Sequence, residues 1–327
     1  MYGDGLKKIV DRLLRVNSVP GDVIQSLWSG YGAIQRFSLD RPPFSIIVKY
    51  INLRRSCDHP RGWSGHRSHQ RKRRSYEVEL YWYENYSNKL ASSCRLPVYY
   101  GCSRNSDEIV LIMEDLDLAG YKHRVDVATP AALNACIRWL AAFHARFMGS
   151  KAAGLWPVGT YWHLDTRPDE LAVLTDNDLK EAAPMIDRRL YECPFQTLVH
   201  GDAKIANFCF GEGLESAAAV DFQYVGGGCG MKDLSYLVGS CVSEQDCLDK
   251  EQEILDTYFD FLDIALKENH SDIDVRDVEK VWRSFYRLAW ADFYRFLKGW
   301  SPHHRKINSY GQYVTAQVVG NLLKGGQ

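Results

Sequence analysis

Three side chains that carry oxygen ligands, those of Asp202, Asn207 and Asp221, lie within residues 198–237. Mg²⁺ prefers hard oxygen ligands and usually binds through one or two protein groups together with substrate phosphates. The Asn207 amide and the Asp221 carboxylate can supply such oxygens. The Asp202 carboxylate is then free to accept a proton from an attacking hydroxyl group. These residue types therefore predict phosphoryl transfer to an alcohol.

Lys204 lies two residues after Asp202, where its charge can offset the negative charge of a phosphoryl group in transit. An Asp, an Asn five residues later and a following Asp-Phe pair share the work of phosphoryl transfer in kinases. Asp and Asn also favour turns, so a purely structural role is the alternative. The fixed spacing of His200, Gly201, Asp202 and Asn207 favours the catalytic interpretation.

Short apolar runs around these residues predict a loop followed by a hairpin. Leu198-Val199 leads into the loop, residues 207–210 leave it, and residues 217–222 return as the second arm. Gly211-Glu212-Gly213 is a turn signal between the two arms. After a glycine-rich segment, Asp233 is predicted to cap the next helix.

The HGD-x4-N sequence of residues 200–207, the VDFQ of residues 220–223 and the DLSYL of residues 233–237 resemble the choline/aminoglycoside kinase-like phosphotransferases. Within them, the resemblance is strongest to the ecdysteroid kinase-like (CHK-type) group. It implies an α+β, bilobal, protein-kinase-like fold, with a small β-rich N-lobe over residues 1–115 and a mainly helical C-lobe over residues 116–327.

The same resemblance implies ATP and Mg²⁺ as cofactors. It makes Asp202 and Lys204 the catalytic residues, and Asn207 and Asp221 the metal ligands. The short distance from Asp221 to Asp233 leaves no room for the long activation segment of protein kinases. A small-molecule acceptor is therefore favoured.

A continuous apolar run over residues 44–50 predicts a strand that contains Lys49. In the resembled family, such a lysine holds the α/β-phosphates and pairs with a glutamate of the following helix. Residues 75–86 predict that helix, and Glu79 fits the family pattern, whereas Glu77 lies about 200° around the helix. An edge lysine and a surface glutamate are the alternatives.

Gly30 and Gly32 lie in the turn of a predicted hairpin, residues 23–39. Glycine there would let backbone N–H groups approach a phosphate. A lone G-x-G is more often a plain hairpin turn.

A second apolar strand, residues 108–113, ends in this family at the hinge between the lobes. The resemblance implies that Met113, Glu114 and Leu116 meet the adenine ring there. The acidic pair Glu114-Asp115 could equally form a capped turn.

The C-terminal third has two apolar stripes at helical spacing, over residues 254–266 and 278–289. An aromatic-rich segment follows, and Trp290, Asp292 and Tyr294 are its candidate acceptor-binding residues. Aromatic faces with an acid could hold a cationic acceptor or stack on a flat polycyclic alcohol. Simple core packing between helices is the alternative.

The composition is that of an ordinary globular protein: 327 residues, 46% hydrophobic and 25% charged, with a formal net charge of −1. No overall field favours nucleic acid or membrane, and no apolar run reaches the length of about 18 residues that a membrane span needs. The charged N-terminus does not resemble a secretory signal. Nine scattered cysteines without a C-x-x-C pair favour free thiols in the cytoplasm.

The segment 52–74 is polar and basic, and three interpretations of it are open. Its arginines could bind nucleic acid or nucleotide phosphates, and Cys57, His59, His66 and His69 could bind a metal. Their spacing matches no standard zinc pattern, so a solvated loop is favoured.

The sequence as a whole predicts an ATP-dependent kinase that phosphorylates the hydroxyl of a small-molecule alcohol, choline-like, sterol-like or other. The alternatives are a catalytically inactive nucleotide-binding regulator of the same fold and an aminoglycoside-type antibiotic phosphotransferase. The choice between ATP and GTP, and the oligomeric state, stay open.

Overall fold

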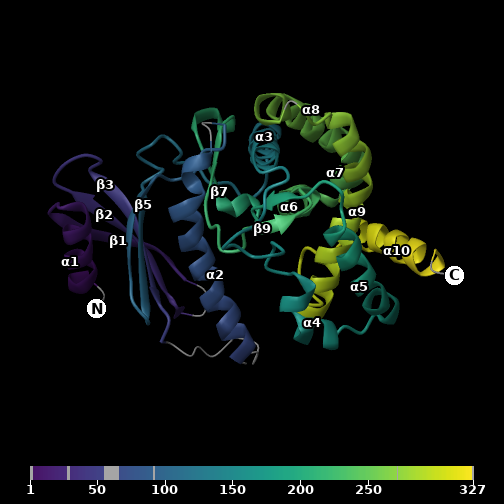
Figure 1. The fold of residues 1–327 in the computed structure, drawn as a ribbon, viewed down its shortest axis with the longest axis horizontal. Helices are drawn as coiled ribbons and strands as arrows, with labels where there is room; N and C mark the ends of the chain where they lie inside the picture. Colours follow the sequence, from purple (N-terminus) through teal and green to yellow (C-terminus); the bar gives the residue numbers. More distant parts are fainter. Residues whose placement is uncertain (1–2, 28–29, 55–65, 91–92, 271, 326–327) are drawn as a thin grey trace. The chain divides into compact units, whose positions relative to one another are not determined.

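A computed structural model describes residues 3–27, 30–54, 66–90, 93–270 and 272–325 (Figure 1). The chain divides into two compact units. The first comprises Met1–Lys89 and Leu96–His123, and the second Leu90–Arg95 and Arg124–Gln327. The lobe boundary predicted from the sequence, residue 115, lies just after the last strand of the first unit. The described residues have the predicted α+β composition, with a sheet in the first unit and mostly helices in the second.

The first unit is built on a five-stranded antiparallel sheet of order β1-β2-β3-β5-β4 (Figure 1). Its strands are β1 (Ser18–Ser26), β2 (Gly32–Leu39), β3 (Ser45–Asn52), β4 (Tyr99–Arg104) and β5 (Glu108–Glu114). Two α-helices accompany it, α1 (Gly3–Leu14) and α2 (His66–Asn85).

Alternation along β3 sends its side chains to opposite faces of the sheet. Ile46 and Val48 are fully buried and pack in one cluster with Leu6 and Val10 of α1. Lys49 points to the opposite face, where it meets α2. One face of the sheet therefore packs an apolar cluster against α1, and the other face presents the buried cation Lys49.

Helix α2 begins at His66, which corrects the prediction of a loop over residues 52–74 for its second half. Residues 66–74 are rich in Arg, Lys and Gln, which have good helix propensity and extend the helix from its apolar part toward the N-terminus. His69 belongs to this helix, with its Nδ1 2.5 Å from the Tyr31 hydroxyl, and a metal-binding role of this histidine stays a prediction. Cys57 and His59 lie outside the described residues.

The second unit contains two small antiparallel hairpin-like pairs among its helices. β6 (Thr197–Val199) pairs with β9 (Gly226–Gly228), and β7 (Phe208–Phe210) pairs with β8 (Ala217–Ala219). The helices are α3 (Pro130–Arg146), α4 (Pro168–Ala172), α5 (Asn177–Tyr191), α6 (Met231–Cys241), α7 (Glu244–Asp249), α8 (Glu251–Asn269), α9 (Val275–Trp300) and α10 (Ser309–Lys324).

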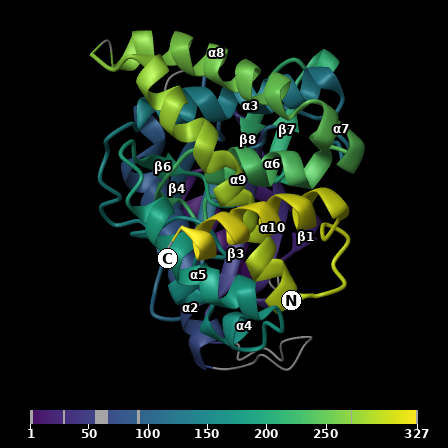
Figure 2. The same ribbon diagram turned by 90° about the vertical axis from the view of Figure 1, so that its right-hand side faces the viewer.

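Helix α9 is the central helix of this unit, in contact with α4, α5, α6, α8 and α10 (Figure 2). It begins at its N-cap Asp274, whose side chain accepts a hydrogen bond from the backbone N–H of Arg276. The apolar stripe of residues 278–289 and the aromatic segment after it belong to this single helix. Its second half is buried on almost all sides, which explains its density of aromatic residues.

The cysteines that the structure describes are all free, and all but Cys102 are buried. Within the described ranges, no helix combines the length and the apolar character needed to cross a membrane.

Candidate active site

Asp233 of α6 holds the loop that follows β6. Its carboxylate is fully buried and accepts hydrogen bonds from the backbone N–H groups of His200, at 2.5 Å, and Gly201, at 2.9 Å. The predicted helix cap at Asp233 is wrong. Gly230, which has no side chain, occupies the N-cap position of α6, and Asp233 lies inside the first turn of the helix. Buried backbone N–H groups need an acceptor, and the Asp233 carboxylate supplies it for His200 and Gly201. Asp233 thereby holds the loop in place.

His144 completes the surroundings of Asp233. Its Nε2 lies 3.2 Å from the Asp233 carboxylate, and its Nδ1 is 2.8 Å from the Tyr258 hydroxyl. The side chain is fully buried. His144 therefore has a structural role in the core.

The His200 ring joins the loop to the hairpin. Its Nδ1 accepts a hydrogen bond from the backbone N–H of Asp202 at 3.3 Å, so the ring proton lies on Nε2, which donates to the Val220 carbonyl at 3.1 Å. The Val220 N–H in turn donates to the Asn207 carbonyl at 2.9 Å. The His200 ring and one backbone hydrogen bond therefore link Asp202 and Asn207 to Val220, the residue before Asp221.

Gly201 permits the turn that presents Asp202. Its φ is +80°, and a Cβ atom there would lie 2.1 Å from the Tyr224 carbonyl oxygen. We expect Gly201→Ala to lower the free energy of unfolding by roughly 3 kcal/mol or more, from strain and overlap together. Gly213→Ala is the matched control, because Gly213 has φ +71° and open space around it. It should cost only about 1 kcal/mol in urea denaturation; equal losses would contradict this role of Gly201.

The Asp202 carboxylate is 6% exposed, and its two oxygens differ. Oδ2 accepts hydrogen bonds from Lys204 Nζ at 3.0 Å and Asn207 Nδ2 at 3.1 Å. Oδ1 is buried and has no hydrogen-bond partner among the described residues. A buried carboxylate oxygen left without a donor is costly, and the Tyr236 hydroxyl is the hydroxyl group of this chain that lies near enough to interact with Asp202.

Lys204 stays protonated in this setting. The charge of Asp202 is the largest cause that raises the pKa of Lys204, burial opposes it, and the charge of Asp221 adds to the rise. Lys204 is thus in direct contact with Asp202, at 3.0 Å, and the charge of Asp221 acts on the same ammonium group.

Asn207 and Asp221 offer oxygens suited to Mg²⁺. The Asn207 amide nitrogen donates hydrogen bonds to the Asp202 carbonyl at 2.8 Å and to Asp202 Oδ2 at 3.1 Å, so the amide oxygen faces the other way. Asp221 has φ +70°, uncommon for a residue other than glycine, and accepts a hydrogen bond from the Gln223 amide. This donor set of hard oxygens fits Mg²⁺.

Within the described ranges, no group of three or more His, Cys, Asp or Glu side chains is arranged to hold a metal by itself. That agrees with an ion that takes its other ligands from substrate phosphates and water.

The first unit brings Lys49 and Glu79 together. Lys49 Nζ lies 2.8 Å from Glu79 Oε1 and 2.7 Å from Oε2, and both side chains are 2% exposed. Glu79, which the sequence favoured over Glu77, is therefore the glutamate that contacts Lys49. Burying the charges of Lys49 and Glu79 costs desolvation free energy. A functional role of this ion pair is therefore worth testing.

Gly30 and Gly32 have structural roles in the hairpin turn. Gly30 has φ +70° and donates its N–H to the Leu27 carbonyl at 3.0 Å. A Cβ atom on Gly32 would lie 1.9 Å from the Tyr50 carbonyl oxygen, so glycine is required for the pairing of β2 with β3. These contacts explain both glycines without a ligand, and a phosphate contact stays a prediction.

At the end of β5, Met113 is buried and the Glu114 N–H donates to the Val98 carbonyl at 2.9 Å. The Asp115 carboxylate accepts from Ser45 Oγ at 2.6 Å, from Arg36 and from the N–H of Asp117. The acidic pair therefore forms a turn fastened to the sheet.

Leu116 is buried after that turn, and its carbonyl accepts the N–H of Tyr121 at 2.8 Å. Contacts of Met113, Glu114 and Leu116 with an adenine ring stay a prediction.

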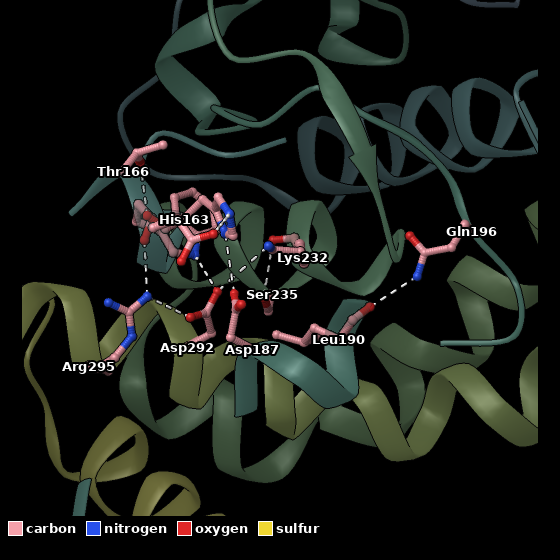
Figure 3. A network of polar contacts seen from close by, with 11 residues as sticks. His163, Thr166, Asp187, Leu190, Gln196, Lys232, Ser235, Asp292 and Arg295 are labelled. Atoms are coloured by element: carbon pink, nitrogen blue, oxygen red, sulfur yellow. Dashed lines mark hydrogen bonds and ion pairs between the residues drawn. The ribbon is translucent and has the colours of Figure 1, made fainter. Parts of the chain in front are cut away.

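The three candidate acceptor residues of α9 are buried in the helical core. Trp290 packs edge-on against Tyr310, with ring centroids 4.7 Å apart, and Tyr294 is 6% exposed. Asp292 lies between Lys232 and Arg295 (Figure 3), 3.7 Å and 2.7 Å away.

Burial raises the pKa of Asp292, but the charges of Arg295 and Lys232 outweigh it and hold that pKa below its usual range. These contacts match the core-packing alternative, so Trp290, Asp292 and Tyr294 have no part in the proposal below.

Sequence reasoning missed three residues beside Asp202. The Tyr161 and Tyr236 hydroxyls are 3.1 Å apart, and Lys306 Nζ lies 4.4 Å from the centroid of the Tyr236 ring. The charge of Asp202 contributes to the pKa of all three side chains. The basic run His303-His304-Arg305-Lys306 was the signal that could have drawn attention to Lys306.

Residues 163–270 match the Ecdysteroid kinase-like family. No curated protein sequence matches the chain significantly. Among solved structures, an aminoglycoside phosphotransferase, APH(4)-Ia, in a ternary complex with ADP and hygromycin B is similar with a TM-score of 0.51 and 11% identity, covering 97% of this chain and 98% of that one.

An ethanolamine kinase of Plasmodium vivax is similar with a TM-score of 0.50 and 11% identity, covering 96% of this chain and 85% of that one. At such identities these likenesses show the fold. The resemblance predicted from residues 198–237 is thus confirmed: the chain has the fold of an aminoglycoside phosphotransferase and an ethanolamine kinase, and its residues 163–270 match the Ecdysteroid kinase-like family.

Proposed function

We propose that this protein is an ATP- and Mg²⁺-dependent phosphotransferase that phosphorylates a hydroxyl group of a small-molecule alcohol. The observation that carries the proposal is the buried Oδ1 of Asp202, which has no partner among the described residues, while Oδ2 is held by Lys204 and Asn207. One carboxylate oxygen is fixed in place by the protein, and the other is ready for a hydroxyl proton.

In the proposed reaction, the acceptor oxygen forms a bond to the γ-phosphorus of ATP as the bond between that phosphorus and the β,γ-bridging oxygen breaks. Asp202 receives the hydroxyl proton, and ADP leaves with the bridging oxygen. Lys204 offsets negative charge on the transferring group. Mg²⁺, when held by Asn207 and Asp221, would neutralise charge on the phosphates.

Lys49 is proposed to bind the α/β-phosphates, with Glu79 fixing the direction of its ammonium group. We expect Lys49→Met to raise the KM for ATP roughly 10- to 100-fold, the equivalent of one lost charge-assisted hydrogen bond. Initial rates at varied ATP concentration test this, and a thermal melt checks that the variant is folded. Lys8→Met on the exposed side of α1 is the control. An unchanged KM for ATP would remove Lys49 from the nucleotide site.

The function itself is tested by incubating the protein with Mg·ATP and pooled alcohols, and searching the products for the mass gain of one phosphate. Products that depend on ATP and disappear in Asp202→Asn support the proposal. A regulator without turnover would yield none of them. The intact set of Asp202, Lys204, Asn207 and Asp221 favours the enzyme over the regulator, because binding alone does not require a proton acceptor.

An aminoglycoside acceptor is less well supported than a simpler alcohol. Polycationic sugars need acidic surroundings, whereas the groups near Asp202 include the ammonium groups of Lys204 and Lys306. The free thiols of the described residues support a reducing compartment such as the cytoplasm as the place of action.

A further inference from the structure

The connection between α9 and α10 carries a lysine that folds back onto aromatic rings. Lys306 Nζ lies 4.4 Å from the Tyr236 ring centroid and 5.6 Å from that of Phe293. These rings belong to a buried aromatic cluster. The ammonium makes no hydrogen bond or ion pair with any other described side chain, so its three N–H donors are not satisfied by the chain.

This aromatic cluster is attached directly to the catalytic loop. The Tyr161 N–H donates to the Gly201 carbonyl at 3.3 Å, and the Tyr161 and Tyr236 hydroxyls are 3.1 Å apart. Lys306 therefore lies over the Tyr236 ring, and the Tyr236 hydroxyl contacts Tyr161, which is hydrogen-bonded to the loop that contains Asp202. The charges of Asp202 and Lys204 both act on Lys306, which agrees with this position.

The charges around Asp202 do not balance on this side. Asp202 and Asp221 supply two negative charges here, whereas Lys204, which bonds to the Asp202 carboxylate, Lys306 and Arg305 supply three positive charges. An acceptor with its own ammonium group would meet like charges, and the Tyr236 face that could hold it by a cation–π contact is occupied by Lys306. An anionic oxygen would instead satisfy the N–H donors of Lys306.

From this geometry we infer that Lys306 is a specificity-determining residue that selects an alcohol bearing an anionic group, a carboxylate or a phosphate, and rejects amino alcohols. The inference rests on the proposed function, because it names the class of acceptor for the same site. Lys306 binds the anionic group, and Asp202 receives the proton of the hydroxyl group.

The test uses probes of matched length: 4-hydroxybutyrate, 4-amino-1-butanol and 1,4-butanediol, with glycerol 3-phosphate as the phosphate arm. Binding is measured by ligand-observed NMR, and phosphorylation by product mass. We expect the wild-type protein to prefer the anionic probes over the amino alcohol at least tenfold. The stronger of the two anionic probes tells whether a carboxylate or a phosphate is the natural group.

Two variants isolate Lys306. Lys306→Met should lower kcat/KM or affinity for the anionic probes roughly 10- to 100-fold relative to butanediol, because the lost charged hydrogen bond is made only to the anionic group. Lys306→Glu should reverse the preference toward the amino alcohol. Lys280→Met, on the exposed side of α9, is the control and should change neither.

The pH dependence gives an independent readout. The pKa of Lys306 is lowered to about 8, mainly by burial. The charges of Lys204 and Arg305 also lower it, whereas those of Asp202 and Cys241 raise it. Because a lysine is charged below its pKa, the preference for anionic probes should be full below pH 7 and fade as the pH rises through about 8. Lys306→Met should show no such fading.

The outcomes separate the two proposals. If neither anionic probe binds, or if Lys306→Met leaves the discrimination between anion and amine unchanged, the inference is overturned whether or not ATP is consumed. If the discrimination depends on Lys306 but no probe is phosphorylated and no ATP is hydrolysed, the site recognises anions and the phosphotransferase function fails.

Discussion

Asp202→Asn is expected to lower kcat roughly 10²- to 10⁴-fold, the usual contribution of a positioned general base. The amide keeps the size of the side chain and an oxygen that can accept from Lys204 and Asn207, but it cannot take a proton. Nucleotide affinity should stay close to that of the wild-type protein, because Asp202 is not assigned to the phosphates. Steady-state rates and an ATP titration, run in parallel, measure the two quantities.

Asp260→Asn on the exposed face of α8 serves as the control for a change from acid to amide. Wild-type turnover in Asp202→Asn on a verified acceptor would show that another group receives the proton. A loss of ATP affinity equal to the loss in kcat would instead make Asp202 a ligand of the metal–nucleotide complex.

Asp233→Ala is expected to have the largest effect on stability. The change removes the acceptor of two buried backbone N–H groups, of His200 and Gly201, and a partner of His144. Breaking such a buried, charged hydrogen-bond set should lower the free energy of unfolding by at least about 3 kcal/mol. Turnover should fall as well, because the loop that presents Asp202 loses its anchor.

Urea denaturation of the wild-type protein and the variant measures the difference. Asp260→Ala on α8 is the matched control, an exposed helical aspartate that should change stability by less than about 0.5 kcal/mol. If Asp233→Ala were as stable as this control, the two backbone groups would have to find other acceptors, and the anchoring role would be wrong.

Local sequence patterns anticipated most of the elements. The spacing of apolar residues predicted α8 and the first part of α9, and continuous apolar runs predicted β3 and β5, because periodicity reports which face of an element is buried. The loop and the hairpin around Asp202, Asn207 and Asp221 were also predicted, since the turn signals lie between adjacent short strands.

Where local signals conflict with packing, the sequence misled. The basic composition of residues 66–74 indicated a loop, yet they continue α2. Trp290, Asp292 and Tyr294 look like a binding motif when read along the chain. In the fold, Trp290 and Tyr294 are buried in the core, and Asp292 is enclosed between Lys232 and Arg295. Composition cannot separate a buried aromatic helix from an aromatic pocket, because both require the same residue types.

The sequence by itself determined the candidate catalytic set: its residue types, their spacing and the short elements that carry them all lie within residues 198–237. Only the tertiary structure decided what surrounds that set. The anchoring of the loop by Asp233 and the placement of Lys306 over Tyr236 join residues from separate helices and connections. Such contacts depend on how helices pack against one another, and the periodicity of apolar residues along one helix does not encode this. The role of a charged side chain such as Lys306 therefore depends on the groups that the fold places beside it.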